Sequence, residues 1–445
     1  MIPIKGKKIL LMGLGLHGGG AATARWLSRH GALLVVSDLR GRKLLEPSIK
    51  ALARRSGVTY VLGKHREADV RWADYVVYNP GVPKESKYLQ LARRLNKPVY
   101  NEASLFFDRC RAPIIAVTGT RGKSTTASLI AAMCKKKNPR TVLAGNITAA
   151  AQSGLGACML SVLDRVTAKH LVVLELSSWQ LEGLNIVRAA PKIAVVTNLY
   201  PDHLNRYRNL AHYYSSKKEI FRHQTRKHFL VLNKDDRVLS QWHAEAASNA
   251  VFFSRGEHRA LMKGMALAGE HNAENAAAAI TAAKRYGVSD RDIRSVLKNP
   301  PVLSGRQEVV AVKRGVAYVN DTTATTPEAG IAALKRFGGR TKNIILIAGG
   351  ADKKLVFNEW AAAVKKHCKQ AHLLSGDASI KQKKALQGFK KLDAGHDDLG
   401  ALVKKVSREA AKGDVILFSP AAASFNLWSH EFERGDAFVA AVSKV

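Results

Sequence analysis

The plainest chemistry in the chain belongs to the ten residues from Val117 to Thr126, which read V-T-G-T-R-G-K-S-T-T. A glycine-punctuated turn of this kind aims successive backbone N–H groups into one concavity, where they hold the phosphates of a nucleotide. Lys123 would place its ammonium on the outer phosphates, and Ser124 would offer its hydroxyl to Mg²⁺. The first glycine of the usual P-loop is Val117 here. The stretch therefore predicts an imperfect P-loop.

A second glycine pattern lies near the N-terminus. Gly13, Gly15 and Gly18 form a literal G-x-G-x-x-G, and Asp38 follows 20 residues after Gly18. This spacing is typical of a Rossmann unit, in which a carboxylate contacts a ribose. The motif is weak alone, because the same turn can hold any nucleotide diphosphate at a helix N-terminus.

Polar side chains also follow two predicted strands behind the P-loop. Glu175 ends the apolar run at 170–176, and His203 follows the run at 192–199. Ligands of open α/β sheets bind beyond the carboxyl ends of the strands. Glu175 and His203 are therefore candidates for contact with Mg²⁺ or substrate. Lys217 and Lys218 lie on a helix predicted from Ala211 to His223, where the pair by itself would be a solvated basic face.

The elements that must position these residues alternate between apolar strands and helices along the whole chain. A strand at 114–117 precedes the P-loop, and a helix from Lys123 to Lys136 follows it. Repeated apolar strands with helices between them are typical of parallel sheets covered on both faces. Paired prolines at 300–301 predict a linker. The sequence predicts an α/β protein with three domains, at 1–111, 112–300 and 301–445.

Length and composition limit the class of protein. A chain of 445 residues with 46% hydrophobic residues is expected to fold into about two to four domains. No signal-peptide pattern precedes the first strand, and no apolar run reaches the roughly 18 residues of a membrane span. The four cysteines form no C-x-x-C pair and lie far apart, at Cys110, Cys134, Cys158 and Cys368. We therefore expect a cytoplasmic protein without a membrane span.

The net charge of +36 would ordinarily indicate nucleic-acid binding. The basic pairs are scattered, however, and no aromatic-basic RNA-reading motif accompanies them. They include Arg54-Arg55, Arg93-Arg94, Lys217-Lys218, Lys365-Lys366, Lys383-Lys384 and Lys404-Lys405. A solvated basic surface is expected, with no specific nucleic-acid partner.

Taken in order, the polar motifs resemble those of the Mur ligases, and among them the branch that adds D-glutamate to UDP-N-acetylmuramoyl-L-alanine. The resemblance covers nearly the whole chain. It rests on T-G-T-x-G-K-S-T at 118–125, E-L-S-S-x-Q-L at 175–181, D-H-L at 202–204, H-N-x-x-N at 271–275, G-R-x-E at 305–308, N-D-x-x-A-T at 320–325, G-G-x-D-K at 349–353 and S-P-A-x-A-S at 419–424. It implies a Rossmann-like UDP-binding domain, a central P-loop ATPase with a mostly parallel sheet, and a C-terminal Rossmann-like domain.

The resemblance also implies roles for individual residues. Substrate UDP-sugar contacts would come from Gly15, Leu16, His17, Asp38, Arg40, Asn79, Gly81 and Asn146. ATP contacts would come from Gly119, Thr120, Arg121, Gly122, Lys123, Ser124, Thr125, Asn275, Arg306 and Asp321. The incoming amino acid would meet Thr325, Lys353 and Ser424. The catalytic set would be Lys123, Glu175, His203 and Lys217.

Two Mg²⁺ ions are implied by the same resemblance. Ser124 and Glu175 would hold one ion. His203 would hold the other together with a carbamylated lysine, which matches Lys217, with Lys218 as the neighbouring alternative. A carbamate forms on a neutral amine and turns a cation into an anionic ligand.

The implied activity is that of an ATP-dependent acid–amino-acid ligase that joins glutamate to UDP-N-acetylmuramoyl-L-alanine through an acyl phosphate, acting as a monomer in peptidoglycan precursor synthesis. Arg121, Gly305 and Thr323 depart from the residues common in that branch. Three alternatives stay open. They are an L-glutamate-adding ligase of the same kind, a folylpolyglutamate-type ligase, and a basic nucleic-acid-binding P-loop ATPase.

Overall fold

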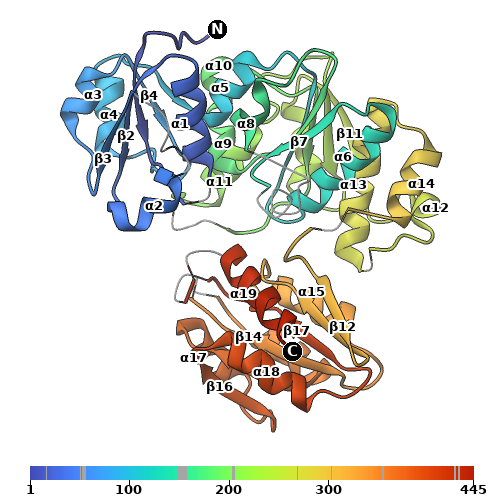
Figure 1. The fold of residues 1–445 in the computed structure, drawn as a ribbon. Coiled ribbons are helices and arrows are strands. Elements are labelled where there is room, and N and C mark those ends of the chain that lie inside the picture. The colour runs from blue at the N-terminus through green and yellow to red at the C-terminus, as the bar shows by residue number, and fades with distance from the viewer. Residues whose placement is uncertain are drawn as a thin grey trace. The chain divides into compact units, whose positions relative to one another are not determined.

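The computed structural model describes every residue except 17, 51, 53–56, 148–157, 203–205, 268, 302, 353–354, 425–426 and 429–430. The described residues form two compact units, Met1–Pro301 and Val302–Val445 (Figure 1). The first unit contains two sheets and the second contains one. The predicted α/β fold with three mostly parallel sheets is confirmed.

The first sheet is parallel, with strand order β3-β2-β1-β4-β5. Its strands are β1 (Lys8–Met12), β2 (Leu33–Asp38), β3 (Val58–Leu62), β4 (Tyr75–Tyr78) and β5 (Val99–Asn101). Its helices are α1 (Gly19–Arg29), α2 (Arg42–Lys50), α3 (Glu67–Trp72), α4 (Lys87–Arg94) and α5 (Glu102–Arg109). The strand order reverses between β1 and β4, so the turns after these two strands flank a topological switch point.

Alternate residues of β1 explain why this sheet is covered on both faces. Ile9 and Leu11 belong to the core that contains Trp26 and Leu27 of α1. Leu10 and Met12 point the other way, into a core formed with α3 and α4. Successive strand side chains alternate between the two faces, so a continuous apolar run fits a strand buried on both sides.

The second sheet is also parallel, with order β11-β10-β9-β6-β8-β7. Its strands are β6 (Ile114–Thr118), β7 (Thr141–Gly145), β8 (Leu171–Glu175), β9 (Ile193–Val196), β10 (Phe229–Asn233) and β11 (Asn249–Phe253). Around them lie α6 (Lys123–Lys137), α8 (Met159–Leu163), α9 (Ser178–Leu181), α10 (Leu184–Val187), α11 (Leu210–Lys218), a 3₁₀ helix (Leu239–Glu245), α12 (Arg259–Met262), α13 (Glu270–Tyr286) and α14 (Asp290–Lys298). The strand β6, which leads into the P-loop, is central.

The helix predicted from Ala211 to His223 is wrong at its C-terminal end, because α11 stops at Lys218. The N–H groups of Ile220 and Phe221 donate to the carbonyl oxygens three residues earlier, at Lys217 and Lys218. Bonds over three residues tighten the chain into turns and end the α-helix. Both side chains are buried in the core, which fixes these turns against the sheet.

The second unit is a six-stranded sheet with order β12-β13-β17-β14-β15-β16. Its strands are β12 (Glu308–Lys313), β13 (Val316–Asn320), β14 (Ile344–Ala348), β15 (Cys368–Leu374), β16 (Leu392–His396) and β17 (Val415–Phe418). Its helices are α15 (Pro327–Phe337), α16 (Asn358–His367), α17 (Asp377–Ala385), α18 (Leu399–Glu409) and α19 (Glu431–Ser443). Only β12 is antiparallel to its neighbour within the described sheet. In the described part of the chain, no helix is long and apolar enough to cross a bilayer.

Candidate active site

The P-loop joins the end of β6 to the start of α6 and is held from the neighbouring strand. Arg121 donates its backbone N–H to Oδ1 of Asn198 at 2.8 Å. Thr120 donates its N–H to the Asn198 carbonyl oxygen at 2.9 Å. Thr197 donates its hydroxyl to the Arg121 carbonyl oxygen at 2.7 Å. These three hydrogen bonds tie the P-loop backbone to the residues that follow β9.

Thr197 and Asn198 are thus positioning residues that were not predicted from the sequence. They follow β9, which pairs with β6 in parallel register. Their signal in the sequence is that they are the polar residues at the end of the apolar run at 192–199. Asp202 follows this run, and its Oδ2 accepts a hydrogen bond from the Arg121 guanidinium at 2.7 Å. This ion pair gives Arg121 a partner on the loop after β9.

Two lysine side chains converge on the P-loop backbone. Lys123 Nζ donates to the Thr120 carbonyl oxygen at 3.0 Å, and Lys217 Nζ donates to the Gly119 carbonyl oxygen at 2.9 Å. Lys217 is only 2% exposed, and its Nζ lies 4.6 Å from the centroid of the Tyr213 ring. Burial, reinforced by the charges of Lys123 and Arg121, lowers the pKa of Lys217 well below its ordinary value. A neutral amine is therefore favoured at this position.

Lys218, the next residue, has a different environment. Its ammonium pairs with the Glu245 carboxylate, with Nζ 2.7 Å from Oε2, and it lies over the Trp242 ring. Both partners belong to the 3₁₀ helix at 239–245. The structure therefore directs Lys217, and not Lys218, to the P-loop.

Glu175 and Ser124 are buried beside the same turn. Glu175 is the last residue of β8 and lies opposite Val117 in the strand register. Its exposed fraction is 3%, and that of Ser124, in the first turn of α6, is 4%. A carboxylate oxygen and a hydroxyl oxygen beside a phosphate-binding turn suit a hard cation that also binds phosphate oxygens. Asn146 follows β7 on the far side of β8 and is exposed.

Asn275 on α13 lies directly against the P-loop glycine. A Cβ atom at Gly122, where φ is 77°, would lie 2.0 Å from Oδ1 of Asn275. Only glycine fits there without displacing the amide. Asn275 therefore packs against the P-loop turn.

The glycine turn after β1 is braced by the residues predicted to hold the UDP-sugar. Asp38 accepts hydrogen bonds from the N–H of Gly15 at 3.0 Å and from the N–H of Arg40 at 2.9 Å. Asn79, after β4, donates its side-chain amide to the Gly13 carbonyl oxygen at 3.1 Å. The turns after β1 and β4 therefore meet at the switch point. Leu16 is half-buried beside this turn, and Gly81 is exposed after β4.

In the second unit, polar residues gather after three adjacent strands, β13, β17 and β14. Asp321 is buried, and its Oδ2 accepts a hydrogen bond from the Ser419 hydroxyl at 2.8 Å. Its Oδ1 accepts one from the backbone N–H of Gln307 at 3.1 Å. Burial raises the pKa of the Asp321 carboxyl to about 7, although these hydrogen bonds and the charges of Arg306 and Arg336 lower it.

This raised pKa predicts a pH-dependent stability. An unfolded aspartate titrates near about 3.9, so between about pH 4 and pH 7 the folded chain binds more protons at Asp321 than the unfolded chain does. The contribution of Asp321 to the free energy of unfolding is therefore expected to fall as pH rises through this window and to level off above it. Asp321→Asn keeps the shape without the titration. The free energy of unfolding of this variant, relative to that of the parent chain, should rise across the window. The rise should be on the order of 1.4 kcal/mol for each unit by which folding raises the pKa of Asp321. Urea unfolding of both proteins at several pH values in this window measures the difference between their free energies of unfolding. A difference that does not change with pH would contradict the prediction.

Arg434 is a buried residue that the sequence analysis did not select. Its exposed fraction is 0%, and its guanidinium donates to the carbonyl oxygens of Thr322 at 2.7 Å and Ala422 at 3.2 Å. Burial lowers the pKa of Arg434 to about 10, so it stays protonated at neutral pH. It ties together the two loops that carry Asp321 and Ser424. Its signal in the sequence is one basic residue on the otherwise apolar face of the helix α19.

The residues predicted to hold an amino acid are described in part. Ser424 is 1% exposed, and its hydroxyl makes no hydrogen bond within the described part of the chain. Thr325 is half-buried and donates its N–H to the Thr323 carbonyl oxygen at 2.9 Å. His17, His203 and Lys353 lie outside the described residues.

Three family models match the chain in order. The model of the Mur ligase MurD-like N-terminal domain matches residues 7–101. The Mur ligase middle domain matches residues 117–264, and the Mur ligase glutamate ligase domain matches residues 305–422. A UDP-N-acetylmuramoylalanine–D-glutamate ligase from Roseiflexus sp. (strain RS-1) is 40% identical, over 98% of each chain. The chain belongs to the Mur ligase family.

Further relatives of this Mur ligase agree with the assignment. A ligase of the same name from Clostridioides difficile is 32% identical over 98% of each chain. Among solved structures, the MurF ligase of Thermotoga maritima in complex with ADP matches with a TM-score of 0.57 at 18% identity, over 99% of this chain and 95% of that one. The UDP-N-acetylmuramoylalanyl-D-glutamyl-2,6-diaminopimelate–D-alanyl-D-alanyl ligase of Acinetobacter baumannii matches with a TM-score of 0.60 at 18% identity, over 100% of this chain and 95% of that one. These structural matches show the same fold.

Mur ligases use ATP and typically Mg²⁺. The residues present fit such an ion, because Ser124 and Glu175 offer a hydroxyl and a carboxylate oxygen beside the phosphate cradle. Mg²⁺ takes few protein ligands and completes its shell with water and phosphate oxygens.

Two departures from the family pattern belong to one local structure. Thr323 donates its hydroxyl to the Gly305 carbonyl oxygen at 2.9 Å. Gly305 has a φ of 69°, and a Cβ there would lie 2.6 Å from a methyl carbon of Thr322. Thr323 and Gly305, which both depart from the residues common in that branch, therefore support the same turn before Arg306.

Proposed function

We propose that this Mur ligase catalyses the ATP-dependent addition of D-glutamate to UDP-N-acetylmuramoyl-L-alanine in peptidoglycan precursor synthesis. The observation that carries the proposal is the P-loop with Lys123, Lys217 and Glu175 around it. It stands in a chain that is 40% identical over its length to a ligase named for this reaction.

A free carboxylate is a poor electrophile, so the reaction begins by activating it. A carboxylate oxygen of the L-alanyl group attacks the γ-phosphorus of ATP, which releases ADP and leaves an acyl phosphate. The amine of glutamate attacks the acyl carbon. The tetrahedral intermediate then expels inorganic phosphate, loses a proton from nitrogen and becomes an amide.

The protein supplies charge and position in this reaction. The N–H groups of the turn and Lys123 neutralise the phosphate oxygens where charge develops in transfer. Ser124 and Glu175 would hold one Mg²⁺, and His203 would hold a second with a carbamate on Lys217. When bound, these ions supply positive charge at the transferring phosphoryl group. Arg306 and Asp321 would contribute from the C-terminal unit.

Carbamylation of Lys217 is supported by its surroundings. Carbon dioxide adds to a neutral amine, and burial favours that form of Lys217. The side chain is directed at the P-loop, where a carbamate oxygen would act as an anionic metal ligand. The neighbouring Lys218 instead pairs with the Glu245 carboxylate.

The remaining substrate groups are assigned by place in the fold. The UDP of the sugar substrate would lie at the switch point of the first sheet, where Asp38 and Asn79 brace the glycine turn. Glutamate would meet Thr325, Lys353 and Ser424. We further propose the domains 1–111, 112–300 and 301–445, a monomer, and a location in the cytoplasm, where ATP and the UDP-sugar are available.

The test is phosphate release from ATP with UDP-N-acetylmuramoyl-L-alanine and a panel of D- and L-amino acids. We expect release with D-glutamate that depends on both substrates. If L-glutamate is the only amino acid of the panel that supports phosphate release, the protein is instead an L-glutamate-adding ligase. Release driven by a folate and glutamate, or by nucleic acid without the UDP-sugar, would contradict it.

A further inference from the structure

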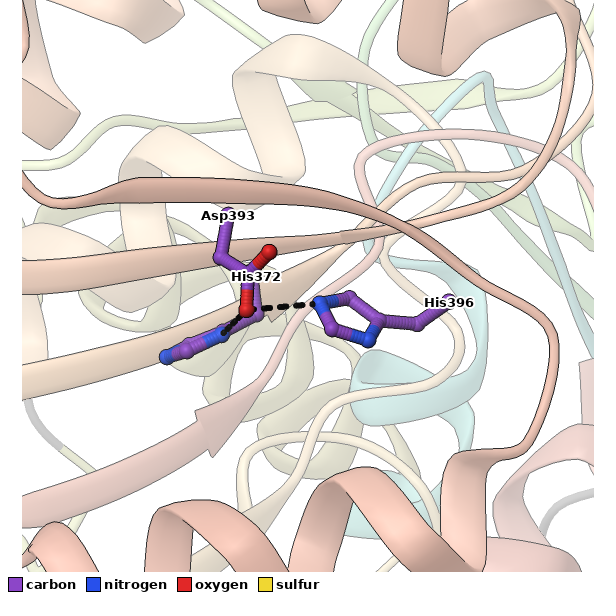
Figure 2. A group of neighbouring side chains, drawn as sticks. All are labelled: His372, Asp393 and His396. Carbon is purple, nitrogen blue, oxygen red and sulfur yellow. Dashed lines mark ion pairs between the residues drawn. The ribbon is translucent and has the colours of Figure 1, made fainter.

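Three side chains that can ligate a metal meet at the edge of the third sheet, where the proposed ligase reaction uses none of them. Oδ2 of Asp393 lies 3.2 Å from Nε2 of His396 and 3.6 Å from Nδ1 of His372. Figure 2 shows the two imidazoles directed at this single carboxylate oxygen from different sides. The three ligand atoms lie within 4.8 Å of one another.

The sheet brings these residues onto one face. His372 on β15 is the register partner of Asp393 on β16. Alternation along β16 would turn His396 to the opposite face, but the register shifts so that His396 pairs with Leu374. The extra residue is Gly395, whose φ of 95° is readily adopted by glycine. This bulge returns His396 to the face that carries His372 and Asp393.

The two histidine nitrogens that face Asp393 lie in ion-pair range of its carboxylate but form no hydrogen bond with it. The His372 side chain is 4% exposed, and its Nδ1 is buried without a hydrogen bond in the part of the chain that the structure describes. The same holds for Nε2 of His396. Buried imidazole nitrogens are usually hydrogen-bonded, because burial removes their contact with water. A cation held between the two imidazoles and the carboxylate would give each nitrogen a direct partner.

We propose that His372, Asp393 and His396 form a binding site for a divalent transition metal of the Zn²⁺ class. Ligands about 2.0–2.2 Å from a tetrahedral metal lie about 3.3–3.5 Å from one another. The observed separations of 3.2 and 3.6 Å bracket this edge length. Two imidazoles and one carboxylate favour Zn²⁺, Co²⁺ or Ni²⁺ over Mg²⁺ or Ca²⁺, which prefer oxygen ligands.

Lys405 on α18 competes for the same carboxylate oxygen. Its Nζ lies 2.5 Å from Oδ2 of Asp393. The Lys405 side chain is 47% exposed, so it can withdraw into solvent when a dication takes its place. Asp393 is 41% exposed, which leaves a path for the metal and a fourth position for water. The bound metal would fasten the edge strand β16 to β15.

The site is separate from the candidate active site of the same unit. Asp321 and Ser419 follow β13 and β17, whereas the histidines belong to β15 and β16, and β14 lies between these pairs of strands. The proposal therefore does not depend on the ligase assignment. Its failure would leave the function proposed above unchanged.

The experiment is calorimetric titration of the chelator-treated full-length protein with Zn²⁺ in excess Mg²⁺ and ADP. The parent chain should bind one equivalent at the cluster. Asp393→Asn and His396→Ala should each weaken that binding by at least about tenfold. Lys405→Ala should tighten it about threefold or more, because it removes the competing ammonium. With Co²⁺ as the probe, the parent chain should show the strong visible absorption of tetrahedral coordination.

His367→Ala is the matched control, because His367 ends α16 in the same unit and is not part of the cluster. It should bind Zn²⁺ as the parent chain does. Lys405→Ala is expected to bind Zn²⁺ more tightly than the parent chain, and a misfolded variant would not gain affinity. Misfolding therefore cannot produce two weakened variants together with one that is strengthened. Equal Zn²⁺ affinity in all the variants, or no binding by the parent chain, would overturn the proposal.

Discussion

Lys123→Ala is expected to lower ATP-dependent amide formation by at least about a thousandfold, since one preorganised charge at a transferring phosphoryl group is worth that much. The Lys123 ammonium already lies at the P-loop, with Nζ 3.0 Å from the Thr120 carbonyl oxygen. The UDP-sugar would bind at the glycine turn of a different sheet, whose brace is Asp38. Affinity for UDP-N-acetylmuramoyl-L-alanine should therefore stay within about twofold of the parent chain.

Lys136→Ala provides the control for this variant. Lys136 lies in the last turn of the same helix, at its exposed end, and carries the same charge. Its loss should leave turnover unchanged. The two measurements are phosphate release and calorimetric binding of the UDP-sugar. Near-normal turnover of Lys123→Ala would show that the P-loop does not take part in the reaction.

Lys217→Ala is expected to lose at least about a hundredfold in activity, because it removes the carbamate that would bind a metal. Added short-chain carboxylates such as acetate should restore part of the activity, since they can occupy the place of the carbamate. The side chain is 2% exposed, so its removal also leaves a small cavity beside Tyr213. A cavity alone would not be repaired by a carboxylate in a concentration-dependent way.

Lys218→Ala is the adjacent control. Its ammonium pairs with Glu245 near the surface, and exposed pairs contribute about 1 kcal/mol or less to stability. Its activity should match that of the parent chain, with or without acetate. Rescue of Lys218→Ala and not of Lys217→Ala would reverse the assignment, and unaffected kinetics of Lys217→Ala would remove this lysine from the site.

The fold was predictable where a long apolar run is followed by a glycine turn. The strand before the P-loop and its helix are such cases, because a buried parallel strand and a glycine turn leave plain patterns. The strands β10 and β11 were not predicted, although they complete the central sheet. Each strand has five residues, of which four are apolar and one is asparagine, and periodicity alone does not separate such a short strand from a buried helical segment.

The site was predictable only for residues that motifs mark directly. Lys217 is an example of the limit, since the sequence offers two adjacent lysines and the choice depends on which one the helix turns inward. Thr197, Asn198 and Arg434 were missed because their roles arise from tertiary contacts. The His372 cluster depends on a bulge at Gly395, and spacing along the chain does not reveal it.

The central claim is that the substrate carboxylate becomes an acyl phosphate before the amide forms. The direct measurement uses UDP-N-acetylmuramoyl-L-alanine labelled with heavy oxygen in its carboxylate, together with ATP and D-glutamate. One labelled oxygen should appear in the released phosphate for each amide formed, because the acyl carbon keeps one oxygen and the phosphate leaves with the other. Amide formation with unlabelled phosphate, or phosphate release without amide, would contradict the account.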